Sequence, residues 1–247
     1  MAYRYALVRE NYEDLASGGV LRSAPGFPAF PVRLASEMFQ RALALHGEPA
    51  ASVWDPCCGS GYLLTVLALL HPRQVTAVLG TDIDPAALHL AERNLALAGR
   101  EGLIARAADL DAHAERLGKP SYTAAAQAAR RLADGLAAGQ RDAAHAVHRA
   151  DVFDPGQLRR ALDGRRPGVV VTDVPYGEQT AWQGPDGASG VAGMLRAPGA
   201  VLPGNAVVAV AVRGRRLRLD DGPQAQTTFR IGTRTVALFR APTDPAR

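Results

Sequence analysis

One stretch decides the fold class of this chain: Val53-Trp54-Asp55-Pro56-Cys57-Cys58-Gly59-Ser60-Gly61. The apolar residues at its start are typical of a buried strand, and the nearly all-apolar residues 62–70 that follow are typical of a helix. Glycines between a strand and a helix let the backbone approach a ligand closely. The stretch therefore predicts a nucleotide-like ligand at the end of a strand in an α/β sheet.

The alternation of strands and helices continues on both sides of this loop. A helix is predicted over Val32–His46 and the first central strand over Ala51–Asp55; a second strand, Val75–Gly80, runs into Thr81-Asp82-Ile83-Asp84-Pro85. A helix over Pro85–Ala98 follows, with Gly99 as its expected C-cap. Consecutive strand-helix units predict a mostly parallel sheet with helices on both faces.

The two ends of the chain and one central stretch do not follow this alternation of strands and helices. Residues 1–47 read as a strand (Tyr3–Val8), a loop and a helix, whereas residues 105–146 read as a helical insertion without a strand. Further strands are expected to end near Asp151 and to span 168–172 and 206–213, before a C-terminal antiparallel hairpin (227–231 and 235–240) turned at Gly232. We expect a single Rossmann-like domain over residues 1–247.

Composition narrows the class of protein. The chain has 247 residues and a net charge of +4, and Lys119 is its only lysine. The arginine excess suits a nucleic-acid partner without requiring one, because a GC-rich genome would produce the same excess. Cys57 and Cys58 are adjacent, which favours neither a disulfide framework nor a metal site. No apolar run approaches the roughly 20 residues of a membrane span, and the first residues do not form a secretory signal, so we expect a cytoplasmic protein.

The glycine loop has the character of a site for a cation-bearing ligand. A dinucleotide site would have a third glycine where Leu64 stands. Asp55, just before the loop, would repel a pyrophosphate but suits a positively charged group. Asp82, at the end of the second strand, lies where a carboxylate accepts hydrogen bonds from ribose hydroxyls. The neighbouring Asp84 precedes Pro85 and is expected to cap the next helix instead.

Two carboxylates are candidates to accept a hydrogen bond from the adenine amino group of such a nucleotide-like ligand. Asp151 follows the third strand and is favoured. Asp109 would take this role if the insertion began later in the chain. The choice between them depends on where the third strand lies.

A third motif, Thr172-Asp173-Val174-Pro175-Tyr176-Gly177, ends the fourth strand. Together with the first two motifs it resembles those of class I methyltransferases that use S-adenosylmethionine (SAM) and modify nitrogens of planar substrates. In that family the last motif is Asn or Asp, two prolines and an aromatic; Val174 replaces the first proline. The resemblance implies SAM as cofactor, held by Asp55, Pro56, Cys58, Gly59, Gly61, Asp82, Ile83, Asp151 and Val152. It also implies a catalytic motif made of Asp173, Val174, Pro175 and Tyr176.

Nearly the whole chain, including residues 27–33 and the helical insertion, resembles the rRNA guanine methyltransferases that confer resistance to the orthosomycin antibiotic avilamycin. This resemblance implies methylation of a guanine in 23S ribosomal RNA, with that RNA or the large ribosomal subunit as partner. It does not indicate which ring position is modified, or the oligomeric state.

Substrate contacts are expected around the catalytic motif. Phe27–Arg33 and residues 178–190 are predicted to form a rim over the target base, and Arg213, Arg215 and Arg216 follow the fifth strand near its carboxyl end. We expect the substrate-binding residues to be Phe30, Arg33, Trp182, Arg213, Arg215 and Arg216. The alternatives are a methyltransferase acting on an amino group of DNA or on a protein glutamine, and an inactive module that binds SAM or RNA.

Overall fold

A seven-stranded sheet forms the centre of the molecule. The structure is a computed structural model, and it describes residues 3–8, 11–136, 142–174, 190–214, 217 and 223–241. The strands are β1 (Ala51–Asp55), β2 (Val75–Asp82), β3 (Ala144–Arg149), β4 (Val169–Asp173), β5 (Val207–Arg213), β6 (Thr227–Ile231) and β7 (Arg234–Arg240). Their spatial order is β3-β2-β1-β4-β5-β7-β6; the first five are parallel, and β7 is antiparallel to β5 and β6. The mostly parallel sheet and the C-terminal hairpin are therefore confirmed.

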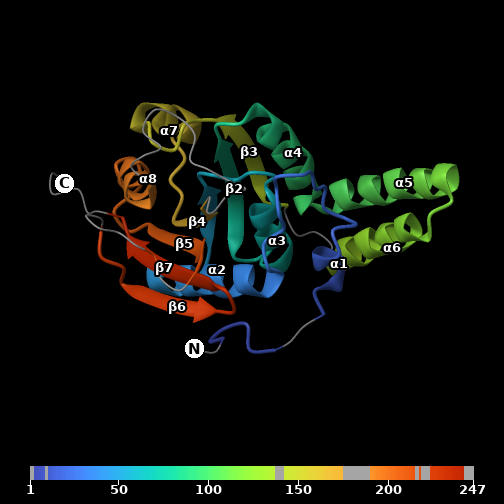
Figure 1. Cartoon of the computed structure of the whole chain (residues 1–247), viewed down its shortest axis with the longest axis horizontal. Coiled ribbons are helices and arrows are strands. Elements are labelled where there is room, and N and C mark those ends of the chain that lie inside the picture. The colour runs from blue at the N-terminus through green and yellow to red at the C-terminus, as the bar shows by residue number, and fades with distance from the viewer. Residues whose placement is uncertain are drawn as a thin grey trace.

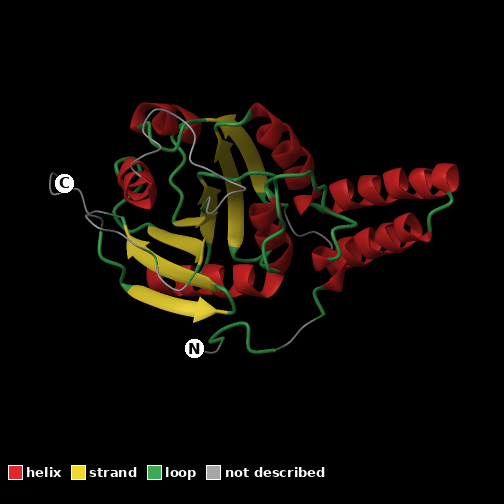
Figure 2. Ribbon diagram, viewed as in Figure 1, coloured by secondary structure: helices red, strands yellow, loops and turns green. Residues whose placement is uncertain are grey.

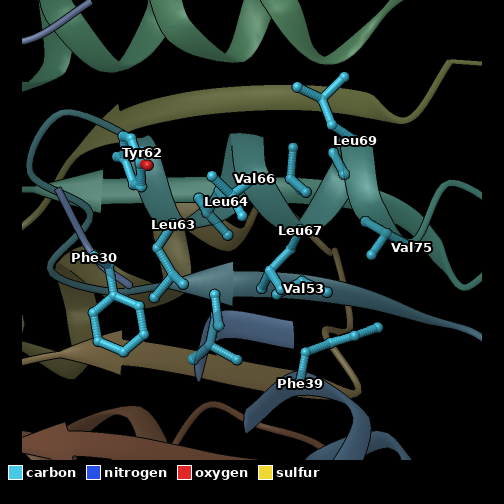
Figure 3. Packing of buried hydrophobic residues seen from close by; sticks show 14 of the residues in the cluster. Phe30, Phe39, Val53, Tyr62, Leu63, Leu64, Val66, Leu67, Leu69 and Val75 are labelled. Atoms are coloured by element: carbon cyan, nitrogen blue, oxygen red, sulfur yellow. The ribbon is translucent and has the colours of Figure 1, made fainter. Parts of the chain in front are cut away.

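Helices cover both faces of this sheet (Figure 2). One face packs against α2 (Val32–His46), α3 (Tyr62–Leu70) and α4 (Pro85–Leu95), and the other against α7 (Pro155–Leu162) and α8 (Gly190–Gly199). Alternate residues of each strand point to opposite faces, so Val53 joins the first core and Trp54 the second. Figure 3 shows Val53 on the first face, near Leu67 of α3 and Phe39 of α2.

The predicted insertion is a pair of helices that extends away from the sheet (Figure 1). It consists of α5 (Arg100–Leu117) and α6 (Pro120–Gly135) and follows the 3-10 helix η1 (Ala96–Ala98). We call residues 100–135 the arm. Gly99 is the C-cap of η1, as predicted for the end of the helix at Ala98, and with φ −123° it is extended and also serves as the N-cap of α5. The predicted range of 105–146 was wrong at its ends, because β3 starts at Ala144 as a mostly exposed edge strand with little apolar signal.

The N-terminal segment does not form the predicted strand. Residues 3–8 are irregular, and the short helix α1 (Glu13–Ala16) follows. The backbone N–H groups of Arg4, Tyr5 and Ala6 donate to the buried carboxylate of Glu37 on α2 at 2.7–2.9 Å. These donors are satisfied by a side chain instead of a neighbouring strand, so a strand pairing is not needed here.

The described residues contain no helix that is long and apolar enough to cross a membrane. Within the same residues, no group of three or more His, Cys, Asp or Glu side chains could hold a metal ion.

Candidate functional site

The carboxyl ends of four adjacent parallel strands bring acidic residues to one edge of the sheet. Asp55 ends β1, Asp82 ends β2, Asp173 ends β4, and Asp151 lies two residues beyond β3. The open edge at the strand carboxyl ends is where α/β sheets bind ligands. The sequence motifs, far apart along the chain, therefore meet at a single edge.

The loop after β1 needs glycine at two positions. Gly59 has φ +51° and Gly61 φ +69°, a left-handed conformation that side chains disfavour. A Cβ on Gly61 would also lie 3.0 Å from the Cα of Ala91 on α4. The loop is therefore shaped by close packing between α3 and α4, and it presents its backbone at the sheet edge.

Cys58, one of the predicted cofactor residues, is buried beside this loop. Its Sγ would lie 3.0 Å from a Cβ on Gly80, so a larger residue at this position of β2 would require Cys58 to shift. Burial raises the pKa of the Cys58 thiol well above its usual value. A thiol that keeps its proton is a poor nucleophile, so the structure supports packing beside the loop for this side chain, and its contact with the cofactor stays a prediction.

Asp82 connects β2 to the glycine loop. Its Oδ2 accepts a hydrogen bond from the Gly59 N–H at 2.9 Å, and its Oδ1 accepts one from the Asp84 N–H at 3.0 Å. Burial raises the pKa of Asp82, and these N–H groups oppose that effect. A carboxylate offers about four acceptor sites, so both oxygens can still accept hydroxyl donors. The Asp84 carboxylate accepts from the Ala86 N–H at 2.8 Å, which confirms its predicted role as the N-cap of α4.

Asp55 is the most deeply buried carboxylate of this edge. It is 2% exposed and accepts a hydrogen bond from the Cys57 N–H at 3.1 Å. Burial raises its pKa to about 7, and the nearby carboxylates of Asp82 and Asp173 add to the effect. A cation placed beside it would favour its charged form. The edge would therefore favour a positively charged ligand over an anionic one.

The two candidates for an adenine contact are well separated. Asp151 is buried after β3, where its Oδ1 accepts from the Phe153 N–H at 2.9 Å. Asp109 lies on α5 in the arm, with a half-exposed side chain 3.3 Å from the Arg22 guanidinium. Asp109 is therefore not at the strand ends, and of the two carboxylates Asp151 alone has the required position.

The remaining predicted cofactor residues adjoin these strand ends. Pro56 follows Asp55 in the loop, Ile83 follows Asp82 and Val152 follows Asp151. The carbonyl of Ile83 accepts a hydrogen bond from Arg149 Nε at 3.1 Å. Phe27 was not predicted at the glycine loop, yet its ring lies 3.4 Å from where a Cβ of Gly59 would be.

Asp173 lies on the far side of β1 from Asp82, next to an arginine that sequence reasoning missed. Arg234 opens β7, and its Nη2 is 3.4 Å from Asp173 Oδ2. Burial raises the pKa of Asp173, whereas Arg234 and Arg213 lower it. Within the described residues, Asp173 Oδ1 is buried without a hydrogen-bond partner, a condition that costs about 1–3 kcal/mol until a donor reaches the atom.

The other members of the catalytic motif are only partly described. Val174 is buried, and its N–H donates to the Ala211 carbonyl at 3.2 Å. Pro175 and Tyr176 lie outside the described residues, as do the predicted substrate residues Trp182, Arg215 and Arg216.

The predicted substrate residues Phe30 and Arg33 have internal partners. Phe30 is 4% exposed, so it is not the exposed rim aromatic that was expected, and the Arg234 guanidinium lies 5.0 Å from its ring centre. Arg33 donates to the carbonyls of Ala6 and Leu7 and lies 3.8 Å over the Tyr3 ring. These contacts hold the N-terminal segment on α2 and account for the arginine without an RNA contact.

Together, the glycine loop after β1, the carboxylates at the ends of β1, β2 and β4, and the antiparallel β7 define a Rossmann-like methyltransferase. The comparisons agree with this class. Two solved structures of the rRNA methyltransferase AviRa from Streptomyces viridochromogenes are similar to this chain with TM-scores of 0.88 and 0.89. They share 52% and 49% identity with it, over 98% of this chain and 97% of each of theirs.

The chain belongs to the rRNA methyltransferase AviRa family, whose family model matches residues 1–234. A Streptomyces viridochromogenes protein named 23S rRNA (guanine(2535)-N(1))-methyltransferase is 53% identical to it over 241 residues. That match covers 97% of this chain and 96% of the relative. The resemblance inferred from the sequence motifs is therefore confirmed at the level of the family.

Proposed function

We propose that this protein transfers a methyl group from SAM to N1 of a guanine in 23S ribosomal RNA, and that the modification protects the ribosome from avilamycin. The strongest support for this proposal is the 53% identity, over nearly the whole of both chains, to a relative named for that reaction. A substrate in the ribosome implies that the enzyme acts in the cytoplasm.

The residues at the sheet edge fit SAM by their chemistry. Asp82 would accept hydrogen bonds from the ribose hydroxyls, Asp151 would accept from the adenine amino group, and Asp55 would face the cationic methionine end. The backbone of Gly59 and Gly61 would line the space between these groups. When bound, SAM supplies an electrophilic methyl group, so the task of the protein is to position the acceptor nitrogen.

The base would enter from the side of β4. Asp173 would accept a hydrogen bond from an N–H of the guanine, and Tyr176 would stack on its ring, as aromatic residues do with unstacked RNA bases. The target must leave its own stack to reach the end of the strand. Arg213, Arg215 and Arg216 would contact phosphates beside the site, which predicts weaker RNA binding at higher salt.

Methyl transfer to defined acceptors tests the proposal. Purified protein and radiolabelled SAM would be incubated with unmodified 23S rRNA, large ribosomal subunits, DNA and bulk protein in parallel. We expect label in the RNA or the subunit, with 1-methylguanosine as the product in nucleoside mass spectrometry. Label confined to DNA or protein would refute the RNA assignment, and no label anywhere would favour an inactive module.

Matched variants make this assay specific to the site. Asp173→Ala should lower single-turnover methylation at least a hundredfold, because loss of one orienting hydrogen bond to a reacting group costs about 2.7–4 kcal/mol in comparable sites. Asp109→Ala, on the surface of the arm, should retain activity. Expression of both variants in an avilamycin-sensitive host should give resistance only with Asp109→Ala.

A further inference from the structure

Arg234, the arginine beside Asp173, has no role in the proposed function described above. Arg234 lies at the carboxyl edge of the parallel sheet because β7 is antiparallel to β5, and the register pairs Arg234 with Arg213. Along β7, Val236 and Leu238 belong to the core of the first face. Since strand residues alternate, Arg234 points to that same face.

Asp173 points to this face as well. Val169 and Val171 of β4 belong to the same core, so Asp173 continues their side of the strand. The register of β4 and β5 pairs Asp173 with Ala211, which is also in that core. The ion pair between Asp173 and Arg234 therefore spans the end of β5 and follows from the register of the sheet.

The guanidinium is held in place from two sides. Asp173 contacts its Nη2, and the buried ring of Phe30 lies under it at 5.0 Å. The Arg234 side chain is 11% exposed and that of Asp173 is 22% exposed. A planar donor group fixed by an aromatic face and a carboxylate is preorganised to recognise a second planar group.

Arg234 as a hydrogen-bond donor and Asp173 as an adjacent acceptor match one edge of guanine. That edge presents the O6 acceptor next to the N1–H donor, whereas adenine has a donor and then an acceptor at the corresponding positions. Arginine carries N–H donors only, and an ionised carboxylate only accepts. The 3.4 Å between Arg234 Nη2 and Asp173 Oδ2 lets neighbouring atoms of one base contact both residues.

We propose that Arg234 recognises O6 of the target guanine while Asp173 accepts the hydrogen bond from N1–H. This inference rests on the proposed function and adds a residue that distinguishes guanine from adenine. As N1 is methylated, its proton passes to the Asp173 carboxylate and later to water. The N1 electron pair forms the new N–C bond, and the C–S bond of SAM breaks with its pair remaining on sulfur. Negative charge that develops on O6 during proton loss is stabilised by Arg234.

The raised pKa of Asp173 agrees with this role, because burial makes its carboxylate a better proton acceptor. Oδ1, the oxygen without a partner among the described residues, would be the accepting atom. Arg234 acts on the base directly, so removing it should alter discrimination between bases as well as the rate.

Binding of matched RNA fragments tests Arg234 without relying on activity. The fragments contain the 23S rRNA position that corresponds to guanine 2535 of the relative, with either guanine or 6-thioguanine at that position. Sulfur is a weaker hydrogen-bond acceptor than oxygen, and 6-thioguanine keeps N1–H. Affinities would be measured with the full chain in the presence of S-adenosylhomocysteine. The wild type should bind the guanine fragment about tenfold more tightly than the 6-thioguanine fragment, as for loss of one charged hydrogen bond.

Arg234→Met, which has no hydrogen-bond donor in its side chain, should bind both fragments equally and more weakly than the wild type. Arg230→Met, on the exposed part of β6, is the matched control and should keep the tenfold preference. If Arg234→Met lost its fold, as judged by calorimetric SAM binding, Arg234→Lys would decide the matter, since it keeps the charge and should retain part of the preference. An unchanged guanine preference in the folded variant would overturn the proposal. Failure of the wild type to bind or methylate the guanine fragment would instead refute the proposed function.

Discussion

Replacing Asp55 by Asn should stabilise the ligand-free protein above pH 7 and weaken its affinity for SAM. The carboxyl is 2% exposed, and burial raises its pKa from 3.8 to about 7. Each pKa unit corresponds to about 1.4 kcal/mol, so ionising Asp55 in the folded state costs on the order of 4 kcal/mol. Asparagine has the same shape and keeps an acceptor oxygen for the Cys57 N–H, but it carries no charge to bury.

The sign of the pH dependence follows from the two states. The unfolded chain releases this proton near pH 3.8, whereas the folded protein holds it until about pH 7. The stability that Asp55 contributes is therefore complete below pH 3.8 and is lost as the pH rises to about 7. Asp55→Asn removes this loss, so its advantage over the wild type should grow by about 2–3 kcal/mol between pH 5 and pH 8.

Urea unfolding of the wild type and the variant at both pH values measures this difference. Asp109→Asn is the matched control, because its side chain is 56% exposed on the arm, and its stability should change by less than about 1 kcal/mol. Calorimetric titration should show SAM affinity at least about tenfold lower for Asp55→Asn, since the carboxylate proposed to face the cation is gone. A stability difference that is the same at pH 5 and pH 8 would refute the reasoning, because Asp55 would then ionise normally despite its burial.

Three further variants probe the rest of the site and its support. Asp82→Ala should weaken SAM binding about 10- to 100-fold in calorimetry, through lost acceptors for ribose and for the Gly59 N–H; unchanged affinity in a folded variant would mean that the ribose is held elsewhere. Tyr176→Ala should weaken RNA binding by about 1–3 kcal/mol of stacking, and Tyr176→Phe should keep most activity; equal damage from both would assign the role to the hydroxyl. Glu37→Ala should lower the free energy of unfolding by roughly 3 kcal/mol, because Arg41 and three backbone donors lose their acceptor. Faster hydrogen exchange at residues 4–6 would accompany this loss, and protected amides there would contradict it.

Local patterns in the sequence predicted most of the helices and strands and the strand-end residues that are proposed to hold the cofactor. The glycine loop, the strand ends at Asp55 and Asp82, and the cap at Asp84 each depend on neighbouring residues, through hydrophobic periodicity, backbone freedom or capping. Such signals can be detected without knowledge of the tertiary structure. Residues 3–8 and 144–149 were predicted wrongly because their local signals do not match the structure that they adopt. The first has strand-like residues but is held by the carboxylate of Glu37, and the second is an edge strand with a weak apolar pattern.

Only the tertiary structure decided which side chains meet on the proposed substrate side. Asp173 and Arg234 are 61 residues apart, and the antiparallel register of β5 and β7 brings them together. No local motif marks Arg234, which reads in the sequence as one arginine among many. Phe30 and Arg33 were assigned to RNA on residue type, but one is buried under Arg234 and the other holds the N-terminal segment. Long-range packing determines the partner of a charged or aromatic side chain, and periodicity along the chain carries no information about it.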